Sequence, residues 1–374
     1  MSQQQRDKAI SILCAKHLHQ SLWLPATPDH PRLRVTFGTT SNFDNTALPA
    51  VLFIGPMFGG RWTTLEFDKL AAECGVRMIC PDRPGMGGST PVALNIRMQV
   101  WLETAPALLQ KLNVPHASLV THSAGGPYTL ATLARQRSIL DPAAPFVGFI
   151  APWVSTSDSN ATLMALASKL PASLLDSLSS VQGFVNARLA PALAFSGGLV
   201  SSSAALLGQQ QSGEPSVGSL QDAAEKYGVD AETARLVRAL AVQFARAEET
   251  TGPNEEAKLC LRKGGEGDWG AGADYGACVR AIAEGERRGA AEEAGGRARL
   301  RVFGCFAASD AMIGRGGQGF FEECWRQEGV GEWVDFETRT CEGTNHDSVL
   351  VDSRRGGMRD CLLRAAERKS ERAT

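Results

Sequence analysis

The sequence Thr121-His122-Ser123-Ala124-Gly125-Gly126 follows an apolar run, residues 117–120, and precedes a helical pattern that continues to Arg137. This order predicts a strand, an abrupt turn that carries a serine, and a helix. Such a turn lifts a hydroxyl out of its own backbone and offers it to a substrate. Ser123 is therefore a candidate nucleophile, and the alternative is an ordinary loop in which Ser123 caps the helix.

Small residues should flank a serine in such a turn. Its backbone occupies a sparsely populated conformation, and the positions two before and two after it crowd each other. Gly125 meets this demand. Thr121 does not, since a β-branched residue stands where the pattern G-x-S-x-G has its first glycine. We expect Thr121 to strain or reshape the turn.

Composition limits the class of protein. The chain has 374 residues, 43% of them hydrophobic, and a net charge of −2, which predicts a soluble globular protein with no field suited to nucleic acid or an anionic membrane. The N-terminal residues lack the apolar segment of a signal peptide and no stretch is apolar enough to span a bilayer, so we expect a cytoplasmic protein. The nine cysteines are scattered, with no C-x-x-C, which argues against a disulfide framework and a zinc site.

Short β-rich runs alternate with helical stretches in the first part of the chain. The predicted strands are 33–37, 51–54, 77–80, 119–120 and 146–150, and the predicted helices are 63–74, 97–112 and 127–140. This alternation indicates an α/β fold, with a mostly parallel central sheet flanked by crossover helices. Strand character returns at 300–306 and 333–336, and a final helix is predicted from Asp347 to Ala366.

An inserted helical region separates these two parts, so that the chain divides into residues 1–154, 155–298 and 299–374. Inside the insertion we find no convincing strand, and the pattern predicts helices over 161–170 and 172–189 and another with Asp230 as its N-cap. Two segments, 196–219 and 263–299, have biased compositions rich in Gly, Ser or Ala. We expect loops or partly disordered chain there, because such compositions support little packed core.

A nucleophilic serine needs a base to take its proton and a carboxylate to orient that base. Asp310 follows a predicted late strand, and His346 lies in a glycine-containing loop before the last helix. The carboxyl ends of strands are where α/β folds collect functional groups. Asp158, which follows an earlier strand, is an alternative acid. His122 adjoins the serine, but we expect it to point elsewhere.

Acyl transfer also needs N–H groups that bind the developing oxyanion. Ala124, directly after the serine and at the positive end of a helix, should supply one of them. The glycine-rich loop 55–60 should supply the other. Pro56 has no N–H, so Met57 is the natural donor, with Phe58 next.

A second glycine-rich loop, residues 81–89, lacks the spacing of a phosphate-binding or dinucleotide-binding site. Its role is then architectural, and we expect Asp82 and Arg83 to tie this loop to the sheet.

Taken together, these motifs resemble those of the α/β-hydrolase superfamily. The resemblance lies in the loop 55–60, in Asp82-Arg83-Pro84-Gly85-Met86-Gly87-Gly88-Ser89, in His122-Ser123-Ala124-Gly125-Gly126, and in Asp310 and His346. It implies the α/β-hydrolase fold, and it implies that the insertion 155–298 forms a helical cap over the active site. Thr121 departs from the family pattern, as does Gly55-Pro56, where many members have His-Gly.

The residues and the resemblance together predict a cofactor-free serine hydrolase with Ser123 as nucleophile, His346 as base and Asp310 as orienting acid. Met57 and Ala124 would form the oxyanion hole. Apolar residues in the predicted cap helices favour a small-molecule substrate, a small or medium apolar ester. We expect no metal and no cofactor, and the sequence leaves the oligomeric state open.

Other activities could use the same three side chains. A short-peptide hydrolase, a lactonase and a carbon–carbon bond hydrolase remain alternatives. Dehalogenases and epoxide hydrolases resemble this fold but carry aspartate where Ser123 stands, which disfavours them. A non-catalytic ligand-binding member of the fold is the rival from another class.

Overall fold

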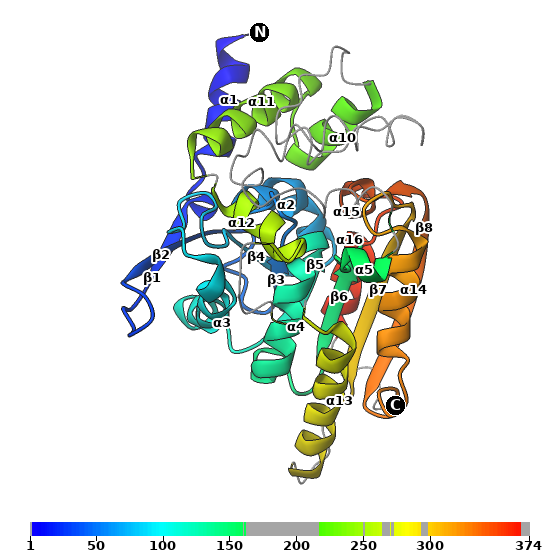
Figure 1. The fold of residues 1–374 in the computed structure, drawn as a ribbon. Coiled ribbons are helices and arrows are strands. Elements are labelled where there is room, and N and C mark those ends of the chain that lie inside the picture. Colours follow the sequence, from blue (N-terminus) through cyan, green and yellow to red (C-terminus); the bar gives the residue numbers. More distant parts are fainter. Residues whose placement is uncertain are drawn as a thin grey trace.

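A computed structural model describes residues 2–159, 161, 217–249, 251–263, 270, 273–292 and 298–367. Within them, one sheet has eight strands in the order β1-β2-β4-β3-β5-β6-β7-β8 (Figure 1). The strands are β1 (Gln20–Leu24), β2 (Leu33–Thr39), β3 (Ala50–Ile54), β4 (Arg77–Pro81), β5 (Ala117–His122), β6 (Phe146–Ile150), β7 (Leu300–Ser309) and β8 (Val334–Asn345). β1, β2 and β4 pair antiparallel, and every pair from β4 to β8 is parallel. The prediction of an α/β fold with a mostly parallel sheet is confirmed.

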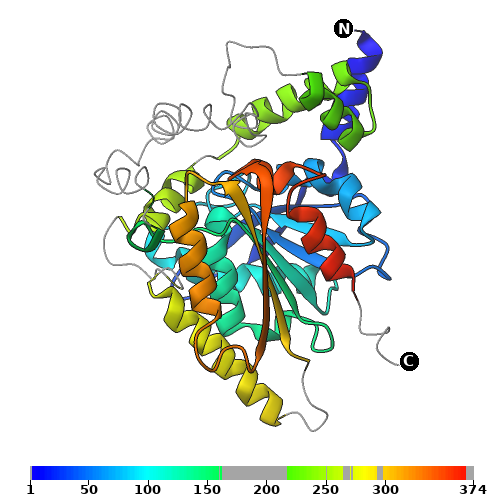
Figure 2. The same ribbon diagram turned by 90° about the vertical axis from the view of Figure 1, so that its right-hand side faces the viewer.

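Both faces of the sheet are covered over its central strands, which explains why β3 and β6 read as continuous apolar runs, whereas the edge strands β1 and β8 vary in burial along their length. Along β5, Leu119 packs in one hydrophobic cluster and Val120 in the other. One face carries α3 (Leu94–Lys111), α4 (Gly126–Arg135), α13 (Tyr275–Glu292) and α14 (Gly314–Trp325), and the other carries α2 (Thr64–Glu73) and α16 (Met358–Ala366) (Figure 2). The sheet is therefore the middle layer of three.

The three helices predicted in the first part of the chain are present as α2, α3 and α4. The last is continued by a short 3-10 helix, η4 (Arg137–Ile139). The expectation of loops over 263–299 was wrong for 275–292, which form α13. Tyr275, Val279 and Ile282 are buried at helical spacing, and this burial against the sheet layer stabilises a helix that the many glycines and alanines concealed.

The final helix, predicted as one element, is two. α15 (Ser348–Val351) ends before a turn, and α16 starts at Met358. The Gly357 N–H donates to Val349 O, and a Cβ on Gly357 would lie 2.3 Å from Cys305 Sγ. The chain therefore turns back at the glycines because only a residue without a side chain can pass so close to β7.

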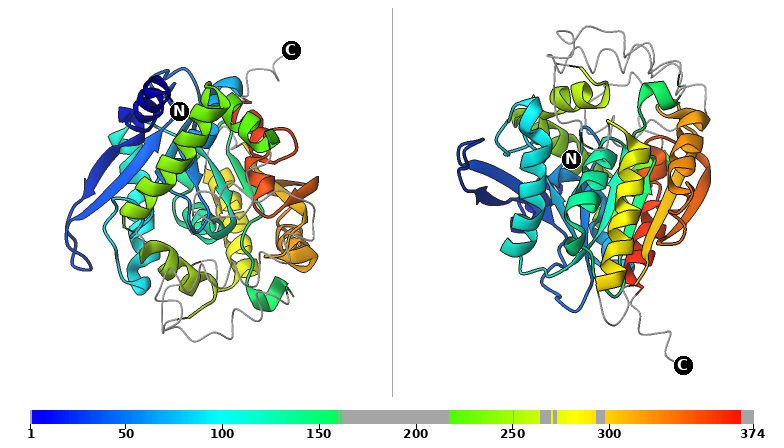
Figure 3. Two further views of the ribbon diagram at one scale, coloured as in Figure 1. Left: turned by 90° about the horizontal axis from the view of Figure 1, so that it is seen from above. Right: turned by 60° about the horizontal axis from the view of Figure 1, so that its bottom comes forward.

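Helices of the insertion lie beyond the carboxyl ends of the strands (Figures 1 and 3). They are α5 (Thr156–Ser159), α10 (Val217–Tyr227), α11 (Ala231–Ala247) and α12 (Thr251–Cys260). The prediction of Asp230 as an N-cap is confirmed, since its side chain accepts a hydrogen bond from Thr233 N. The helices predicted over 161–170 and 172–189, and most of the biased segment 196–219, lie outside the described residues.

The N-terminal helix α1 (Gln3–Leu13) packs on the insertion. Ala9 and Leu13 share a hydrophobic cluster with Val237 and Ala241 of α11, and Figure 2 shows the two helices side by side. A 3-10 helix, η1 (Lys16–Leu18), then leads into β1, and two more are η2 (Arg61–Thr63) and η3 (Ser123–Gly125). Of the helices in the described ranges, none combines the length and the apolar character needed to cross a bilayer.

Candidate active site

Ser123 lies in the predicted turn between β5 and α4. β5 ends at His122, η3 follows, and α4 begins at Gly126. The backbone of Ser123 has a φ of 50°, in the left-handed region that residues other than glycine seldom adopt. The strain of the turn is thus localised at the serine itself, and its hydroxyl is directed away from the strand.

Gly125 makes this turn possible. A Cβ at this position would lie 2.2 Å from Ile54 O and 2.4 Å from Thr121 Oγ1. The buried Thr121 uses the same space, because its Oγ1 donates a hydrogen bond of 3.0 Å to Ile54 O. Thr121 is accommodated where the pattern has glycine because Gly125 leaves room for its hydroxyl.

The structure brings His346 and Asp310 to Ser123 from the ends of β8 and β7. His346 Nε2 lies 2.9 Å from Ser123 Oγ, and His346 Nδ1 lies 2.8 Å from Asp310 Oδ2. Because a carboxylate only accepts, the imidazole donates its Nδ1–H to Asp310, and the neutral ring then accepts from the serine hydroxyl through Nε2. The arrangement can move a proton away from Ser123.

Charges and burial act on this pair in opposite directions. Burial alone would lower the pKa of His346, and the Asp310 carboxylate overcomes this effect, so the pKa of His346 is raised above 6.5. Burial alone would raise the pKa of Asp310, but attraction to the protonated form of His346 lowers it, helped by hydrogen bonds that Asp310 Oδ1 accepts from the N–H groups of Met312 and Ile313. Asp310 is therefore ionised and fixed in orientation.

The other candidate side chains lie elsewhere. Asp158 is in α5, where it accepts a hydrogen bond from Ser157 Oγ. His122 points away from the Ser123 hydroxyl and donates from Nε2 to the backbone carbonyl of His346, over 2.9 Å. Burial, with the neighbouring His346, lowers the pKa of His122 to about 4. A neutral His122 thus holds the backbone at His346 in place, and sequence reasoning missed this contact.

The loop 55–60 lies against the serine turn. A Cβ on Gly125 would be 2.8 Å from Gly55 O, so the loop and the residue two positions after the serine are neighbours. Gly59 N–H closes the loop by donating to Pro56 O. The Met57 N–H donates to no acceptor within the described part of the chain, and Ala124 is buried in η3.

Asp82 and Arg83 behave differently from each other. Asp82 ties its loop to the core, as expected, by accepting from Arg61 N, Arg61 Nη1 and Thr36 Oγ1. Arg83 instead reaches Gly55 O, Pro56 O and the carboxylate of Glu256 in α12. Sequence reasoning missed Glu256 because no motif surrounds it.

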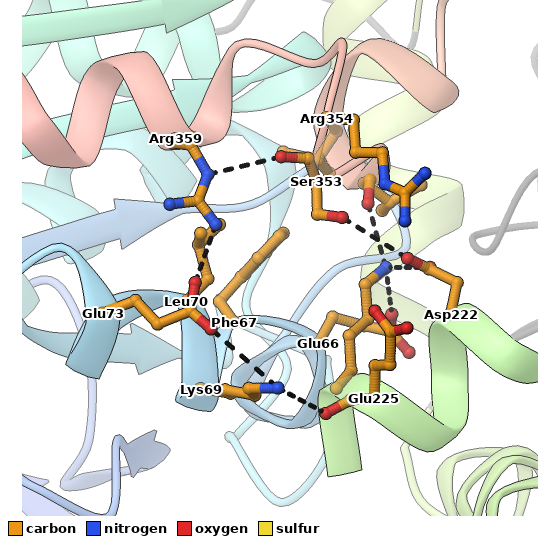
Figure 4. A pocket seen from close by; sticks show the side chains of 13 residues that line it. Glu66, Phe67, Lys69, Leu70, Glu73, Asp222, Glu225, Ser353, Arg354 and Arg359 are labelled. Atoms are coloured by element: carbon orange, nitrogen blue, oxygen red, sulfur yellow. Dashed lines mark hydrogen bonds and ion pairs between the residues drawn. The ribbon is translucent and has the colours of Figure 1, made fainter. Parts of the chain in front are cut away.

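Away from the serine, a cavity of about 430 Å³ lies between α2, α10 and residues 350–359 (Figure 4). Its charged side chains pair with one another: Glu73 with Lys69 and Arg359, and Lys226 with Glu66 and Asp222. Such mutual pairing leaves the lining near neutral. The nucleophile–base contact lies at Ser123, so this cavity is not part of the candidate active site.

Among the described residues, no three His, Cys, Asp or Glu side chains gather as metal ligands would. The strongest chemical arrangement in these ranges is the line of Ser123, His346 and Asp310.

Comparisons with known proteins bear on the fold. The structure is similar to a bromoperoxidase from Bacillus anthracis, with 15% identity, a TM-score of 0.51 and coverage of 92% of this chain and 99% of the other. It is also similar to a membrane phospholipase A described as a bacterial virulence factor, with 12% identity, a TM-score of 0.51 and coverage of 95% and 89%. At these identities the likeness concerns the fold alone. No curated protein matches the sequence.

The family itself is settled by sequence. A model described as the alpha/beta hydrolase family matches residues 51–354, which span more than half of the chain and contain the loop 55–60, Ser123, Asp310 and His346. The sheet order and the covering helices agree with this match, and the resemblance drawn from the motifs is confirmed. The chain belongs to the alpha/beta hydrolase family.

Proposed function

We propose that this protein is a cofactor-free serine hydrolase that transfers acyl groups to water and acts on small or medium apolar carboxylic esters. The observation that carries the proposal is the pair of contacts made by His346, 2.9 Å to Ser123 Oγ and 2.8 Å to Asp310 Oδ2. The same pair of contacts defines nucleophile, base and orienting acid in serine hydrolases of unrelated folds.

Each residue then has a defined task. His346 takes the proton as Ser123 Oγ attacks the ester carbonyl, and it returns that proton to the leaving alcohol. Water repeats the sequence on the acyl-enzyme, with His346 again as base. Asp310 keeps the Nδ1–H tautomer and stabilises the imidazolium that forms in each step.

The oxyanion would be bound by the N–H groups of Met57 and Ala124. Two features support this assignment. Gly55 O lies near the Cβ position of Gly125, which puts the loop beside the serine turn. Met57 N–H has no acceptor among the described residues, so it is available to a substrate.

Trp153 connects the serine turn with a small cleft. The N–H of Trp153 donates to Ser123 O, which puts this tryptophan beside the nucleophile. Its side chain lines a small cleft in which Pro127, Leu259 and Tyr275 stand beside the charged Asp158 and Arg262, and the apolar part of this lining supports an apolar substrate. We also propose that the part of the insertion 155–298 that lies beyond the strand ends, and not α13, is the cap over this site, because α12 supplies Leu259 to the same cleft.

Fluorophosphonate labelling tests the nucleophile. We expect one adduct on wild-type protein, at Ser123, and none on Ser123→Ala. The control is Ser157→Ala, since Ser157 is an exposed serine near the same strand ends, and this variant should label like wild type. An adduct that persists on Ser123→Ala would refute the assignment.

A series of p-nitrophenyl esters of increasing acyl length tests the substrate class. Short and medium chains should be cleaved by wild type, and Ser123→Ala should lose about 10⁶-fold in kcat. Labelling at Ser123 without cleavage of any ester would contradict the ester assignment and leave the peptide, lactone and carbon–carbon bond alternatives. No labelling and no cleavage would favour a ligand-binding protein.

A further inference from the structure

Arg83 and Glu256 form a buried ion pair directly behind the loop that carries Met57. Arg83 Nη1 donates to Gly55 O and Arg83 Nη2 donates to Pro56 O, each over 2.7 Å. Both side chains of the pair are at most 1% exposed. The guanidinium therefore holds two successive carbonyl groups of the loop at once.

The second of these contacts acts on the proposed oxyanion donor. Pro56 O and the Met57 N–H belong to one peptide group, and no cis peptide bond occurs in the described residues. In a trans peptide the carbonyl and the N–H point in opposite directions within one plane. Pro56 O also accepts from Gly59 N–H within the loop, so two donors together fix this carbonyl, and with it the direction of the Met57 N–H. The positive charge of Arg83 beside the carbonyl oxygen also polarises the peptide and makes its N–H a stronger donor.

Glu256 holds Arg83 in this position. Arg83 Nε donates to Glu256 Oε1 and Arg83 Nη2 donates to Glu256 Oε2, each over 2.6 Å, in a bidentate pair. Arg97 donates to the same carboxylate through Nη2, over 3.0 Å, and to Tyr128 through Nε. Burial alone would lower the pKa of Arg83, and the Glu256 carboxylate reverses this effect, so the guanidinium stays charged.

The helix that carries Glu256 is itself docked on the loop 81–89. Gly252 N–H donates to Gly85 O over 2.7 Å, and a Cβ on Gly252 would lie 2.7 Å from that oxygen. Just before α12, Glu248 accepts from Arg61 Nη2 and from Trp62 Nε1. Backbone contact and ion pairs together leave α12 little freedom to shift, and the position of Glu256 is set by the insertion.

We infer that Arg83 and Glu256 are positioning residues for catalysis: the insertion, through Glu256, holds Arg83 against Pro56 O and so aims the Met57 N–H at the oxyanion. This inference rests on the proposed function. It assigns to α12 an indirect influence on the transition state, through Arg83 and the loop 55–60, besides any contact it makes with substrate.

The test compares transition-state binding with ground-state binding. Glu256→Gln keeps the shape of the side chain but removes its charge, and Arg83→Lys keeps a charge but cannot hold both carbonyls. On the p-nitrophenyl ester that wild type cleaves fastest, we expect kcat to fall about 10-fold for Glu256→Gln and about 100-fold for Arg83→Lys, against about 10²–10³-fold for loss of a whole oxyanion donor. KM should stay within about threefold of wild type, because substrate binding needs no oxyanion contact.

Two inhibitors sharpen the readout. A trifluoromethyl ketone with the same acyl chain forms an oxyanion on attack by Ser123, whereas the corresponding secondary alcohol does not. The inhibition constant of the ketone should rise by the same factor as kcat falls, and that of the alcohol should not change. Glu286→Gln is the matched control, since Glu286 forms a buried pair with Arg137 outside the site, and we expect it to leave kcat and both inhibition constants unchanged.

Each outcome decides between the two proposals. Any of three results would overturn the inference: inhibition constants that rise equally for the ketone and the alcohol, a change in KM without a change in kcat, or unchanged kinetics in folded Arg83→Lys. In each case ester turnover by wild type would still uphold the hydrolase. Absence of both Ser123 labelling and ester turnover in wild type would overturn the hydrolase and the inference together. Arg83→Lys carries the test if Glu256→Gln does not fold.

Discussion

Gly125→Ala is the substitution that tests the serine turn most severely. The new Cβ would lie 2.2 Å from Ile54 O, 2.4 Å from Thr121 Oγ1 and 2.8 Å from Gly55 O. Two of these atoms are backbone oxygens, and Ile54 belongs to the central strand β3. No side-chain rotation can relieve the clash, so the strand and the turn must move apart.

The size of the effect follows from these distances. An ordinary contact begins at 3.4 Å, so β3 and the turn must separate by roughly 1 Å, and misplacements of about 1 Å cost on the order of 10²-fold in catalysis. Overpacking a buried site costs about 1–3 kcal/mol, and rigid backbone puts this case at the upper end. We expect the free energy of unfolding to fall by about 3 kcal/mol and the rate of Ser123 labelling to fall about 100-fold.

Gly285→Ala is the matched control. It makes the same chemical change in the interior of α13, where a Cβ would meet nothing within 4 Å. This variant should gain about 0.5–1 kcal/mol because alanine favours the helix. Urea unfolding followed by tryptophan fluorescence measures both variants.

A second variant separates the two kinds of contact. Adding Thr121→Gly to Gly125→Ala removes the hydroxyl but leaves Ile54 O in place, so we expect little recovery of stability or labelling. The reasoning is refuted if Gly125→Ala unfolds within about 0.5 kcal/mol of wild type, the usual range of harmless substitutions, and labels at the wild-type rate.

Three further predictions concern the base, the insertion and the turn. The pKa of His346 is raised above 6.5, and only the neutral imidazole accepts a proton, so kcat/KM should fall as the pH drops through an inflection above 6.5. Asp310→Asn should move this inflection down and cut kcat about 10⁴-fold. A wild-type inflection at or below pH 6.5 would contradict the assignment of His346 as the base. Ile282→Ala should cost about 2–5 kcal/mol of unfolding free energy, because Ile282 is buried in α13, whereas Leu363→Ala, at an exposed leucine, should change urea stability little. Thr121→Val keeps the shape but loses the hydrogen bond to Ile54 O, so urea unfolding should show a loss of about 1 kcal/mol with labelling of the serine retained.

The sequence was sufficient to foresee seven of the eight strands, all but the edge strand β1, and the meeting of Ser123, Asp310 and His346. Parallel strands end at one edge, so residues that directly follow β5, β7 and β8 had to approach one another. Periodicity failed at α13, whose helix depends on burial of a few apolar side chains within a segment of small residues. Burial depends on the rest of the molecule, which no local pattern records.

The contact between Arg83 and Glu256 was out of reach for a different reason. These residues are 173 positions apart, and neither spacing nor composition connects them. The sequence indicated that the loop 81–89 was structural, but it did not indicate which way Arg83 would face. The docking of α12 determines that Arg83 contacts the loop that carries Met57. Asp82, the residue before it, contacts the core instead.

The packing of α1 on α11 has a consequence for the order in which the protein acquires its structure during synthesis. Gln5 Nε2 donates to Asp230 Oδ1 across 225 positions of the chain, and at about 5–20 residues per second the ribosome needs roughly 10–45 s to cover that distance. α1 has 11 residues, fewer than the about 12–15 at which an isolated helix becomes even marginally stable in water. α1 is therefore completed only once α11 has been translated, and until then Ala9 and Leu13 can pack only against the nearer members of their cluster, such as Trp62 and Leu65.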